Sequence, residues 1–216
     1  MVCRECVALL MLASASKARH RLLEQVGMSH SLMASGLDEE SYKSPDALKM
    51  VEALAFAKAK AVMERLVFDT SENSPYRKVT SIVGCDSVFV FQDEVFGKPK
   101  DSKEAIERWE RMSSNSGVLI TGHALLFNSS QLACKSQFTF DGLIQAVIST
   151  RVEFVDLNLA EIEEYVSTGE PMKCAGGFAL EGKGARFIGS IDGCYSNVIG
   201  LSLPWLRTAL AFACIE

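Results

Sequence analysis

A carboxylate interrupts one of the most apolar segments of the sequence. Asp86 lies two residues after Gly84 in the segment 81–91, which is rich in Ile, Val and Phe and is typical of a buried strand. Such a carboxylate is costly unless it is paired, hydrogen-bonded or bound to a metal, and Gly84 leaves room for another group to approach the backbone. Asp86 is therefore either a functional carboxylate or the cap of a turn at a strand end, and residue type alone leaves both open.

Two lysines are candidates for binding an anion. Lys58 lies on the apolar stripe of a predicted helix, at helical spacing from Leu54 and Val62. Its ammonium either reaches solvent past small alanines, which its position alone favours, or points into a cleft. Lys98 lies in the turn 97–99, between a glycine and a proline, where most lysines are simply solvated.

Two serines and a glutamate stand in segments that could approach a phosphate or a nucleotide. Ser14 and Ser16 lie between a predicted strand and a predicted helix, where backbone N–H groups favour anions. Ser16 also suits the N-cap of that helix, and spacing alone favours this role, while GxxxxGK[ST] is absent and excludes a P-loop. Glu181 lies in the glycine-rich segment 176–184, which indicates turns as readily as a nucleotide-binding loop because no GxGxxG is complete.

The seven cysteines are odd in number and scattered, which indicates reduced thiols in a cytoplasmic protein. Cys3 and Cys6 have the spacing of a zinc or redox pair, but no second pair follows. A cysteine protease is excluded because no histidine can be placed beside Cys85 by spacing, and because Cys85 and Asp86 should face opposite sides of a strand.

Strands and helices alternate loosely along the chain, which predicts an α/β fold with a mixed sheet. The expected strands are 7–12, 81–91 with 95–96 as its hairpin partner, 117–127 and 143–155. The expected helices are 17–26, one that begins at residue 45, 102–112, 159–167 and 204–215. The stretch 128–142 is expected to be a loop or a poorly ordered hairpin end.

Residues that favour helix starts support these helices. In the segment 44–46, serine is the expected cap, proline the first helical residue and aspartate a favourable charge for the helix dipole. Asp101 and Glu104 have the spacing of a capping box, and Asn158 can cap the helix that follows it.

Composition indicates one globular domain over residues 1–216, with residues 1–6 frayed. The chain is 48% hydrophobic and 23% charged, with a net charge of −5. The net negative charge argues against a nucleic-acid partner, but a small anionic substrate can still bind a local basic pocket. We expect a cytoplasmic protein without a membrane partner, because no apolar run is long enough to span and no basic region precedes the apolar start.

Six segments together resemble the Maf family of nucleotide pyrophosphatases, in the same order and over nearly the whole chain. They are LASASKARHRLL at 12–23 for the family's LASxSPRRxxLL, the acidic pair 38–39, LAxxKA at 54–59, GxD at 84–86 with GKP at 97–99, the EIxxYVxTGEPxxxAGxxxxxGxG block at 161–184, and SNVIGLSL at 196–203 for SNVxGLPL. The resemblance implies a two-lobed α/β fold with an elongated mixed sheet flanked by helices and a central cleft. It also implies hydrolysis of a nucleoside triphosphate to monophosphate and pyrophosphate with a divalent metal, and a possible homodimer.

The resemblance assigns roles to individual residues. The family's proton-accepting aspartate falls on Asp86, its phosphate-contacting lysines on Lys58 and Lys98, and the second arginine of its opening motif on Arg19. Several cations and a metal suit a triphosphate, since they spread the charge that develops on leaving pyrophosphate. Glu39 is the candidate metal ligand together with Asp86, because carboxylate oxygens suit Mg²⁺ or Mn²⁺, and the hydroxyls of Ser14 and Ser16 would bind phosphate oxygens.

Three positions that separate the family's branches point to the base. The branch that acts on dTTP and UTP resembles Arg, Thr and Gln there, and the branch that acts on 7-methyl-GTP resembles Trp, Gln and Glu. Here they are Ala18, Ser87 and Glu181, so only Glu181 matches, and it matches the second branch. A carboxylate accepts from guanine or cytosine and repels the carbonyl edges of uracil and thymine, which favours a guanine- or cytosine-type base.

Two departures keep other functions open. The family's opening proline is Lys17 here and its first arginine is Ala18, and Lys17 is no equivalent of an arginine fork. A non-catalytic nucleotide-binding regulator linked to cell division would bind nucleotide without releasing product. A phosphatase that removes only the terminal phosphate would release orthophosphate in place of pyrophosphate.

Overall fold

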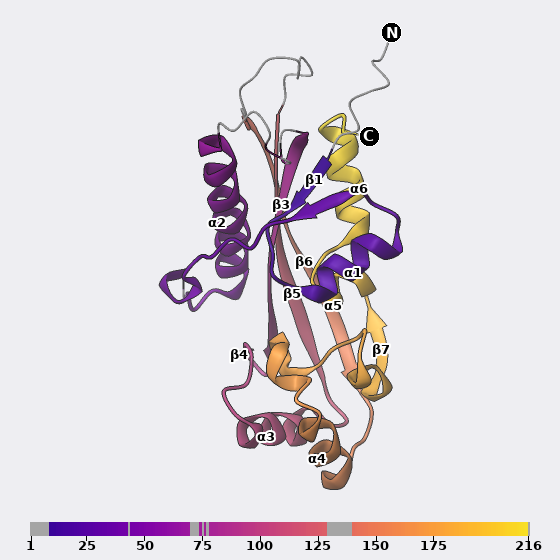
Figure 1. The fold of residues 1–216 in the computed structure, drawn as a ribbon. Helices are drawn as coiled ribbons and strands as arrows, with labels where there is room; N and C mark the ends of the chain where they lie inside the picture. The colour runs from indigo at the N-terminus through magenta and orange to yellow at the C-terminus, as the bar shows by residue number, and fades with distance from the viewer. Residues whose placement is uncertain are drawn as a thin grey trace.

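A twisted mixed sheet of seven strands forms the centre of the molecule (Figure 1). The computed structural model describes residues 9–42, 44–69, 74, 76, 78–128 and 140–215, without the side chain of Glu40. The strands are β1 (Leu9–Leu12), β2 (His30–Leu32), β3 (Val79–Phe91), β4 (Glu94–Phe96), β5 (Ser116–Phe127), β6 (Gly142–Phe154) and β7 (Ile188–Asp192). Their order is β2-β1-β3-β5-β6-β7, with β4 paired to β3. Since β1 runs parallel to β2 and β3 and the other pairs are antiparallel, the prediction of a mixed α/β sheet is confirmed.

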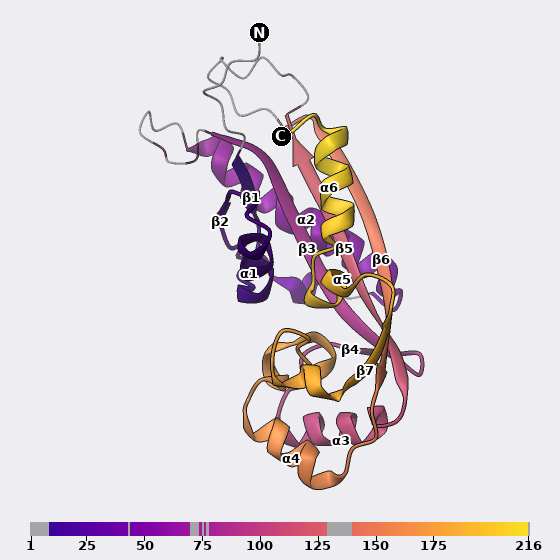
Figure 2. The ribbon, with the colours of Figure 1, turned by 90° about the vertical axis from the view of Figure 1, so that its right-hand side faces the viewer.

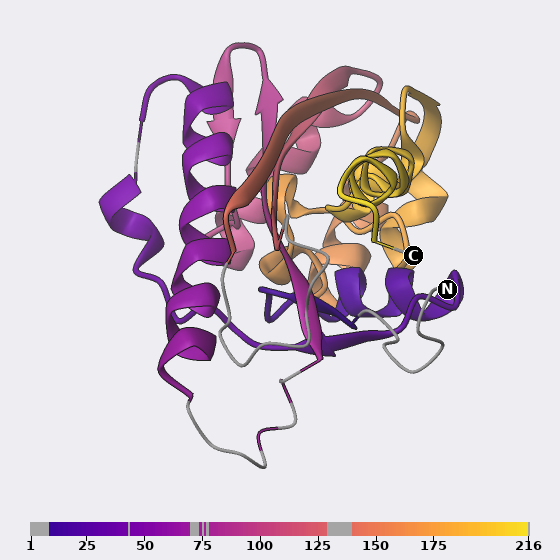
Figure 3. The same ribbon diagram turned by 90° about the horizontal axis from the view of Figure 1, so that it is seen from above.

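The helices cover the sheet in two groups. They are α1 (Lys17–Gln25), α2 (Ala47–Phe68), α3 (Ser102–Met112), α4 (Leu159–Ser167), α5 (Tyr195–Ile199) and α6 (Leu203–Phe212), with short 3₁₀ turns η1 (Glu39–Tyr42), η2 (Pro171–Lys173), η3 (Ala175–Gly177) and η4 (Lys183–Phe187). Seen from above, α2 lies on one side of the sheet and α6 on the other (Figure 3). The second group, α3 and α4, lies at the far end of the long strands (Figure 2).

Each end of the sheet has its own apolar core. Near α3 and α4 the core is aromatic: Trp109 packs edge-on against Phe154 and Tyr165, and its Nε1 donates to the Gly177 carbonyl over 3.0 Å. At the other end, aliphatic residues of β1, β3 and β5 pack under α6 on one face and under α2 on the other. Because β3, β5 and β6 run through both ends, they connect the two groups of helices into an elongated molecule (Figure 1).

Two predicted helix starts need correction. The N-cap of α2 is Asp46 rather than Ser44, because the Asp46 carboxylate accepts from two backbone N–H groups while the Ser44 hydroxyl accepts from Asp46 itself. Asp101 caps α3 as predicted, but Glu104 accepts from the N–H of Lys100 instead of closing a capping box. The capping box at Asn158 is complete.

The other element boundaries differ from the predictions by a few residues. The first strand and first helix are β1 and α1, the last helix ends at Phe212, and the sequence did not predict β2, β7 or α5. The predicted frayed segment 1–6, the Cys3 and Cys6 pair and most of the predicted loop 128–142 lie outside the described residues. Within the described part of the chain, no helix is both long and apolar enough to cross a membrane.

Candidate active site

Two glycines let α2 lie directly on the sheet. A Cβ added at Gly84 would lie 2.2 Å from the Ala55 carbonyl oxygen, and one at Gly122 would lie 2.1 Å from that of Val51. Gly122 is also the cross-strand partner of Asp86. The missing side chains therefore bring the backbone of α2 against β3 and β5 beside Asp86, and the expectation that Gly84 admits another group to the backbone is confirmed.

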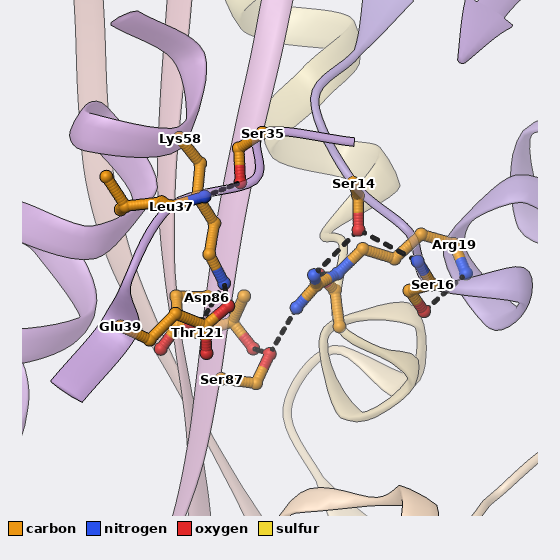
Figure 4. A network of polar contacts seen from close by, with 11 residues as sticks. Ser14, Ser16, Arg19, Ser35, Leu37, Glu39, Lys58, Asp86, Ser87 and Thr121 are labelled. Atoms are coloured by element: carbon orange, nitrogen blue, oxygen red, sulfur yellow. Dashed lines mark hydrogen bonds and ion pairs between the residues drawn. The ribbon is translucent and has the colours of Figure 1, made fainter. Parts of the chain in front are cut away.

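This close packing places the ammonium of Lys58 between two carboxylates (Figure 4). Lys58 Nζ donates to Asp86 Oδ1 over 2.6 Å and lies 2.7 Å from Glu39 Oε1. Lys58 is only 6% exposed and Asp86 8%. The position-based preference for a lysine that reaches solvent is wrong, because this face of α2 meets the sheet, and the cation there is stabilised by the carboxylates around it.

Glu39 reaches Lys58 from η1, on a segment that α2 also holds. Arg65 of α2 donates from Nη1 to the Ala34 carbonyl over 2.8 Å and from Nη2 to that of Ser35. Burial raises the pKa of Glu39, but the hydrogen bond and charge of Lys58, together with the charges of Lys98 and Arg19, outweigh it and lower the pKa below 4.5. The Glu39 carboxylate is therefore in the field of three cations.

Arg19 is the centre of a second network, which connects α1 to β3 and to the segment before α6 (Figure 4). Its Nε donates to the Gly200 carbonyl over 2.7 Å, its Nη1 to Ser14 Oγ over 3.2 Å and its Nη2 to Ser87 Oγ over 3.0 Å. Ser87 Oγ in turn lies 2.9 Å from Thr121 Oγ1. Since Ser87 follows Asp86 in β3, the strand connects this network to the Lys58 cluster.

The two serines at the start of α1 form a compact turn. The Ser16 hydroxyl accepts from the N–H of Arg19 over 3.4 Å, and the Ser16 N–H donates to Ser14 Oγ over 3.1 Å. The expectation that Ser16 is an N-cap is therefore confirmed. Binding of phosphate by these hydroxyls stays a prediction, in a place where the helix N-terminus and Arg19 both favour an anion.

Lys98 lies in the turn between β4 and α3. Its turn is held because Arg108 of α3 donates to the Gly97 carbonyl over 2.8 Å and the N–H of Gly176 donates to the same oxygen over 3.3 Å. The charge of Lys98 lowers the pKa of Glu39 and also opposes the increase at Cys174, whose pKa burial raises to about 11. Lys98 thus acts electrostatically on both Glu39 and Cys174 without a direct bond to Asp86.

The three base-specificity candidates come from separate elements. Ala18 lies half-buried in the first turn of α1, Ser87 is bound to Arg19, and Glu181 lies in the segment between η3 and η4. Desolvation raises the pKa of Glu181, although its side chain is exposed, and the charge of Arg21 on α1 acts in the opposite direction. That interaction places Glu181 within electrostatic range of α1, the helix that carries Ala18.

Sequence patterns alone missed Thr121 and Gly200, which complete the Arg19 network. Thr121 Oγ1 also donates to the Asn197 carbonyl over 3.1 Å, and Asn197 Nδ2 donates to Thr150 Oγ1 over 3.1 Å. Thr121 lies opposite Ser87 in the β3–β5 register, so only the strand pairing could have revealed it. Asn197 and Gly200 do lie within the motif at 196–203.

The same register overturns one step in the exclusion of a cysteine protease. His123 is the direct cross-strand partner of Cys85, so a histidine does lie beside that cysteine. Both residues are fully buried, burial raises the pKa of Cys85 to about 11, and burial lowers the pKa of His123 to about 3 while its Nε2 accepts from the Ser202 N–H. A neutral thiol without access to substrate is no nucleophile, so the exclusion holds for this different reason.

A divalent metal fits the two carboxylates only together with a substrate. Within the described residues, no group of three or more His, Cys, Asp or Glu side chains is arranged to hold a metal. Glu39 and Asp86 each use one oxygen on Lys58, which leaves a second carboxylate oxygen on each. Mg²⁺ is commonly bound by one or two carboxylates plus substrate phosphates, which is the set that these residues and a triphosphate would supply.

Comparison with known proteins identifies the family. Residues 9–213 match the family model described as Maf-like protein, and the chain belongs to this family. It is 50% identical over 202 residues to a "Nucleoside triphosphate pyrophosphatase" of Prochlorococcus marinus (strain SARG), over 94% of this chain and 96% of that protein. It is also 50% identical over 202 residues to a protein of the same name from Synechococcus sp. (strain CC9605), over 93% of this chain and all of that protein.

Proposed function

We propose that this chain hydrolyses a nucleoside triphosphate to the monophosphate and pyrophosphate, with Asp86 as the base and a divalent metal held by Glu39 and Asp86. The class of enzyme, a nucleoside triphosphate pyrophosphatase and so a hydrolase acting on acid anhydrides, follows from the family and from relatives that are half identical over nearly the whole chain. The observation that carries the assignment to these residues is the Lys58 ammonium, which lies between the Asp86 and Glu39 carboxylates.

Asp86 is suited to accept a proton from water. In the reaction, a water oxygen bonds to the α-phosphorus, its proton passes to an Asp86 oxygen, and the bond from the α-phosphorus to the bridging oxygen breaks to release pyrophosphate. The Asp86 carboxylate accepts a hydrogen bond from Lys58. A triphosphate gives the Lys58 ammonium a competing anion, so substrate binding weakens its hold on Asp86 and leaves that carboxylate free to take the proton.

Cations that act on Glu39 oppose the charge of the substrate. Lys58, Lys98 and Arg19 all act on the Glu39 carboxylate, so a triphosphate bound there would lie in the same field. A bound Mg²⁺ or Mn²⁺ would neutralise phosphate charge and polarise the phosphorus–oxygen bonds. Ser14 and Ser16 add hydroxyls at the N-terminus of α1 for phosphate oxygens.

The base preference rests on Glu181. A carboxylate accepts from the N1–H and amino groups of guanine or from the amino group of cytosine, and repels the carbonyl edge of uracil or thymine. Because Ala18 offers no ring to stack on, the 7-methyl-GTP preference of one family branch is supported by Glu181 alone. We therefore place the substrate among guanine- or cytosine-type nucleotides, including modified ones that such an enzyme would remove from the nucleotide pool.

A substrate screen tests this function. Purified protein is mixed with canonical and modified nucleoside triphosphates in Mg²⁺ or Mn²⁺, and pyrophosphate and orthophosphate are measured separately. Pyrophosphate with the monophosphate is the expected product, with guanine or cytosine nucleotides ahead of UTP and dTTP. Orthophosphate would select a terminal phosphatase, and binding without any product would select the non-catalytic regulator.

Two variants separate the base assignment from the chemistry. Glu181→Gln should change the order of substrates, because an amide both donates and accepts. Glu107→Gln is the matched control, since Glu107 lies on the exposed surface of α3 and pairs with Lys103, over 3.8 Å. An unchanged order in Glu181→Gln would show that Glu181 does not read the base.

Three further expectations stay proposals. We propose that residues 1–216 form a single domain of two lobes, that the protein acts in the cytoplasm, and that it forms a homodimer. Analytical ultracentrifugation at micromolar concentration tests the homodimer, and a sedimentation coefficient of a monomer would reject it.

A further inference from the structure

The segment that carries Glu181 is folded around another carboxylate, that of Glu170. Glu170 Oε1 accepts from the N–H of Gly184 over 2.9 Å, and its Oε2 accepts from the N–H of Lys183 over 2.9 Å. A Cβ added at Gly182 would lie 2.3 Å from Glu170 Oε2, so the backbone passes directly against the carboxylate. The residues immediately after Glu181 are thus held by Glu170.

Tyr165 holds the residues on the other side of Glu181. Its hydroxyl donates to Glu170 Oε1 over 2.7 Å and accepts from the N–H of Ala179 over 3.3 Å. A hydrogen bond from the N–H of Gly182 to the Ala179 carbonyl, over 3.4 Å, closes the turn that contains Glu181. One hydrogen-bonded pair from α4 and the segment after it therefore fixes both ends of this turn.

Glu170 also acts on Glu181 through its charge. Burial raises the pKa of Glu170, but the hydrogen bonds from Tyr165 and from the N–H groups of Lys183 and Gly184 outweigh it and lower the pKa below 4.5. Glu170 is therefore ionised at neutral pH, and its negative charge adds to the desolvation that raises the pKa of Glu181. Position and proton affinity of the Glu181 carboxylate thus both depend on Glu170.

We propose that Glu170, together with Tyr165, is a positioning residue that sets where the Glu181 carboxylate meets the nucleobase, and so determines base selectivity. This inference rests on the proposed function, in which Glu181 reads the base. Glu170 bonds to none of Asp86, Lys58 and Glu39, which lie on β3, α2 and η1, so its effect should fall on the choice of base and leave the chemical step unchanged.

The test compares Glu170→Gln, Tyr165→Phe and Glu107→Gln with the unmodified protein, using GTP and UTP with Mg²⁺. An amide at 170 has one acceptor oxygen, so it keeps only part of the bonds to the backbone N–H groups of 183 and 184. We expect the ratio of kcat/KM for GTP over UTP to fall about tenfold in Glu170→Gln, the effect of weakening one charge-assisted bond. The change should appear in KM, with kcat for GTP within about twofold, because the base is held by binding interactions.

The other variants make the outcome decisive. Tyr165→Phe keeps the bonds from Glu170 to the backbone and should lower the ratio by a smaller factor, while Glu107→Gln should leave it unchanged. If melting shows that Glu170→Gln does not fold, Tyr165→Phe alone decides the question, and an unchanged ratio in it overturns the proposal. A fall in kcat that is equal for both nucleotides would show a general structural role and also overturn it.

Glu181→Gln distinguishes failure of this inference from failure of the proposed function. A changed ratio in Glu181→Gln with an unchanged ratio in Glu170→Gln overturns the positioning role and leaves the base assignment intact. An unchanged ratio in Glu181→Gln removes the base assignment and the positioning role with it, while pyrophosphate release at Asp86 is judged separately.

Discussion

Gly84→Ala tests whether the close contact between α2 and the sheet positions the active site. A Cβ at residue 84 would lie 2.2 Å from the Ala55 carbonyl oxygen and 2.8 Å from the Ala59 nitrogen, both backbone atoms that cannot rotate away. A carbon–oxygen contact needs about 3.3 Å, so α2 would have to move outward by about 1 Å. Lys58 lies between these two residues on the helix and would move with them, away from Asp86 Oδ1, which it now reaches over 2.6 Å.

The expected losses follow from that displacement. Over-packing of a tight contact costs about 1–3 kcal/mol of unfolding free energy, which for a chain of this size lowers the melting temperature by about 2–12 °C. A misplacement of about 1 Å in the active site costs about 100-fold in turnover. We therefore expect a folded protein whose pyrophosphate release is reduced about 100-fold, measured with a coupled pyrophosphate assay beside thermal melting.

Gly189→Ala is the matched control for this experiment. A Cβ at Gly189 would lie 3.4 Å from Val155 Cγ1, an ordinary contact on β7. The control should keep both the melting temperature and the turnover of the unmodified protein. Full activity and an unchanged melting temperature in Gly84→Ala would refute the reasoning that connects helix packing to the position of Lys58.

Three further perturbations probe the cluster itself. Lys58→Met leaves the buried Asp86 carboxylate unpaired, so it should destabilise the fold by about 3 kcal/mol in urea unfolding and abolish turnover; a stable, active variant would show that the ion pair is dispensable. Burial raises the pKa of Glu39 but Lys58 lowers it further, so its carboxylate stabilises the fold above pH 4.5 and loses this contribution as the pH falls through the lower folded pKa. The difference in melting temperature between the protein and Glu39→Gln should therefore vanish on acidification, and a gap that persists to about pH 2 contradicts this. EDTA should remove turnover and Mg²⁺ or Mn²⁺ restore it, with about tenfold more metal needed in Glu39→Gln; activity that survives complete chelation would exclude the metal.

Residue patterns predicted the long elements because each of them carries a strong local signal. The apolar run of β3, the capping residues Asp101 and Asn158, and the helical periodicity of α2 all depend on neighbours in sequence. The strands β2 and β7 have three and five residues, which is too few for a period to emerge. Their place in the sheet is determined by pairing with β1 and β6, which no local pattern reports.

The structure brings several of the predicted site residues together, but the sequence could not show the contacts that they make. Helical periodicity showed that Lys58 lies on the apolar face of α2, but what that face meets depends on Gly84 and Gly122, which bring the helix against the sheet. For the same reason, Thr121 beside Ser87 follows only from strand register. These contacts join residues that are far apart in the sequence. The ordered motifs indicated only which residue types to expect at the site.

The most direct test of the central claim is pyrophosphate release by Asp86→Asn. The amide is almost isosteric with the carboxylate and its oxygen can still accept from Lys58, so melting should show a folded protein, but an amide cannot act as a base. We predict that turnover on the best nucleotide falls by about 1,000-fold or more while the melting temperature stays within a few degrees of the unmodified protein. Turnover within a few-fold of the unmodified protein would contradict the role of Asp86 as the base.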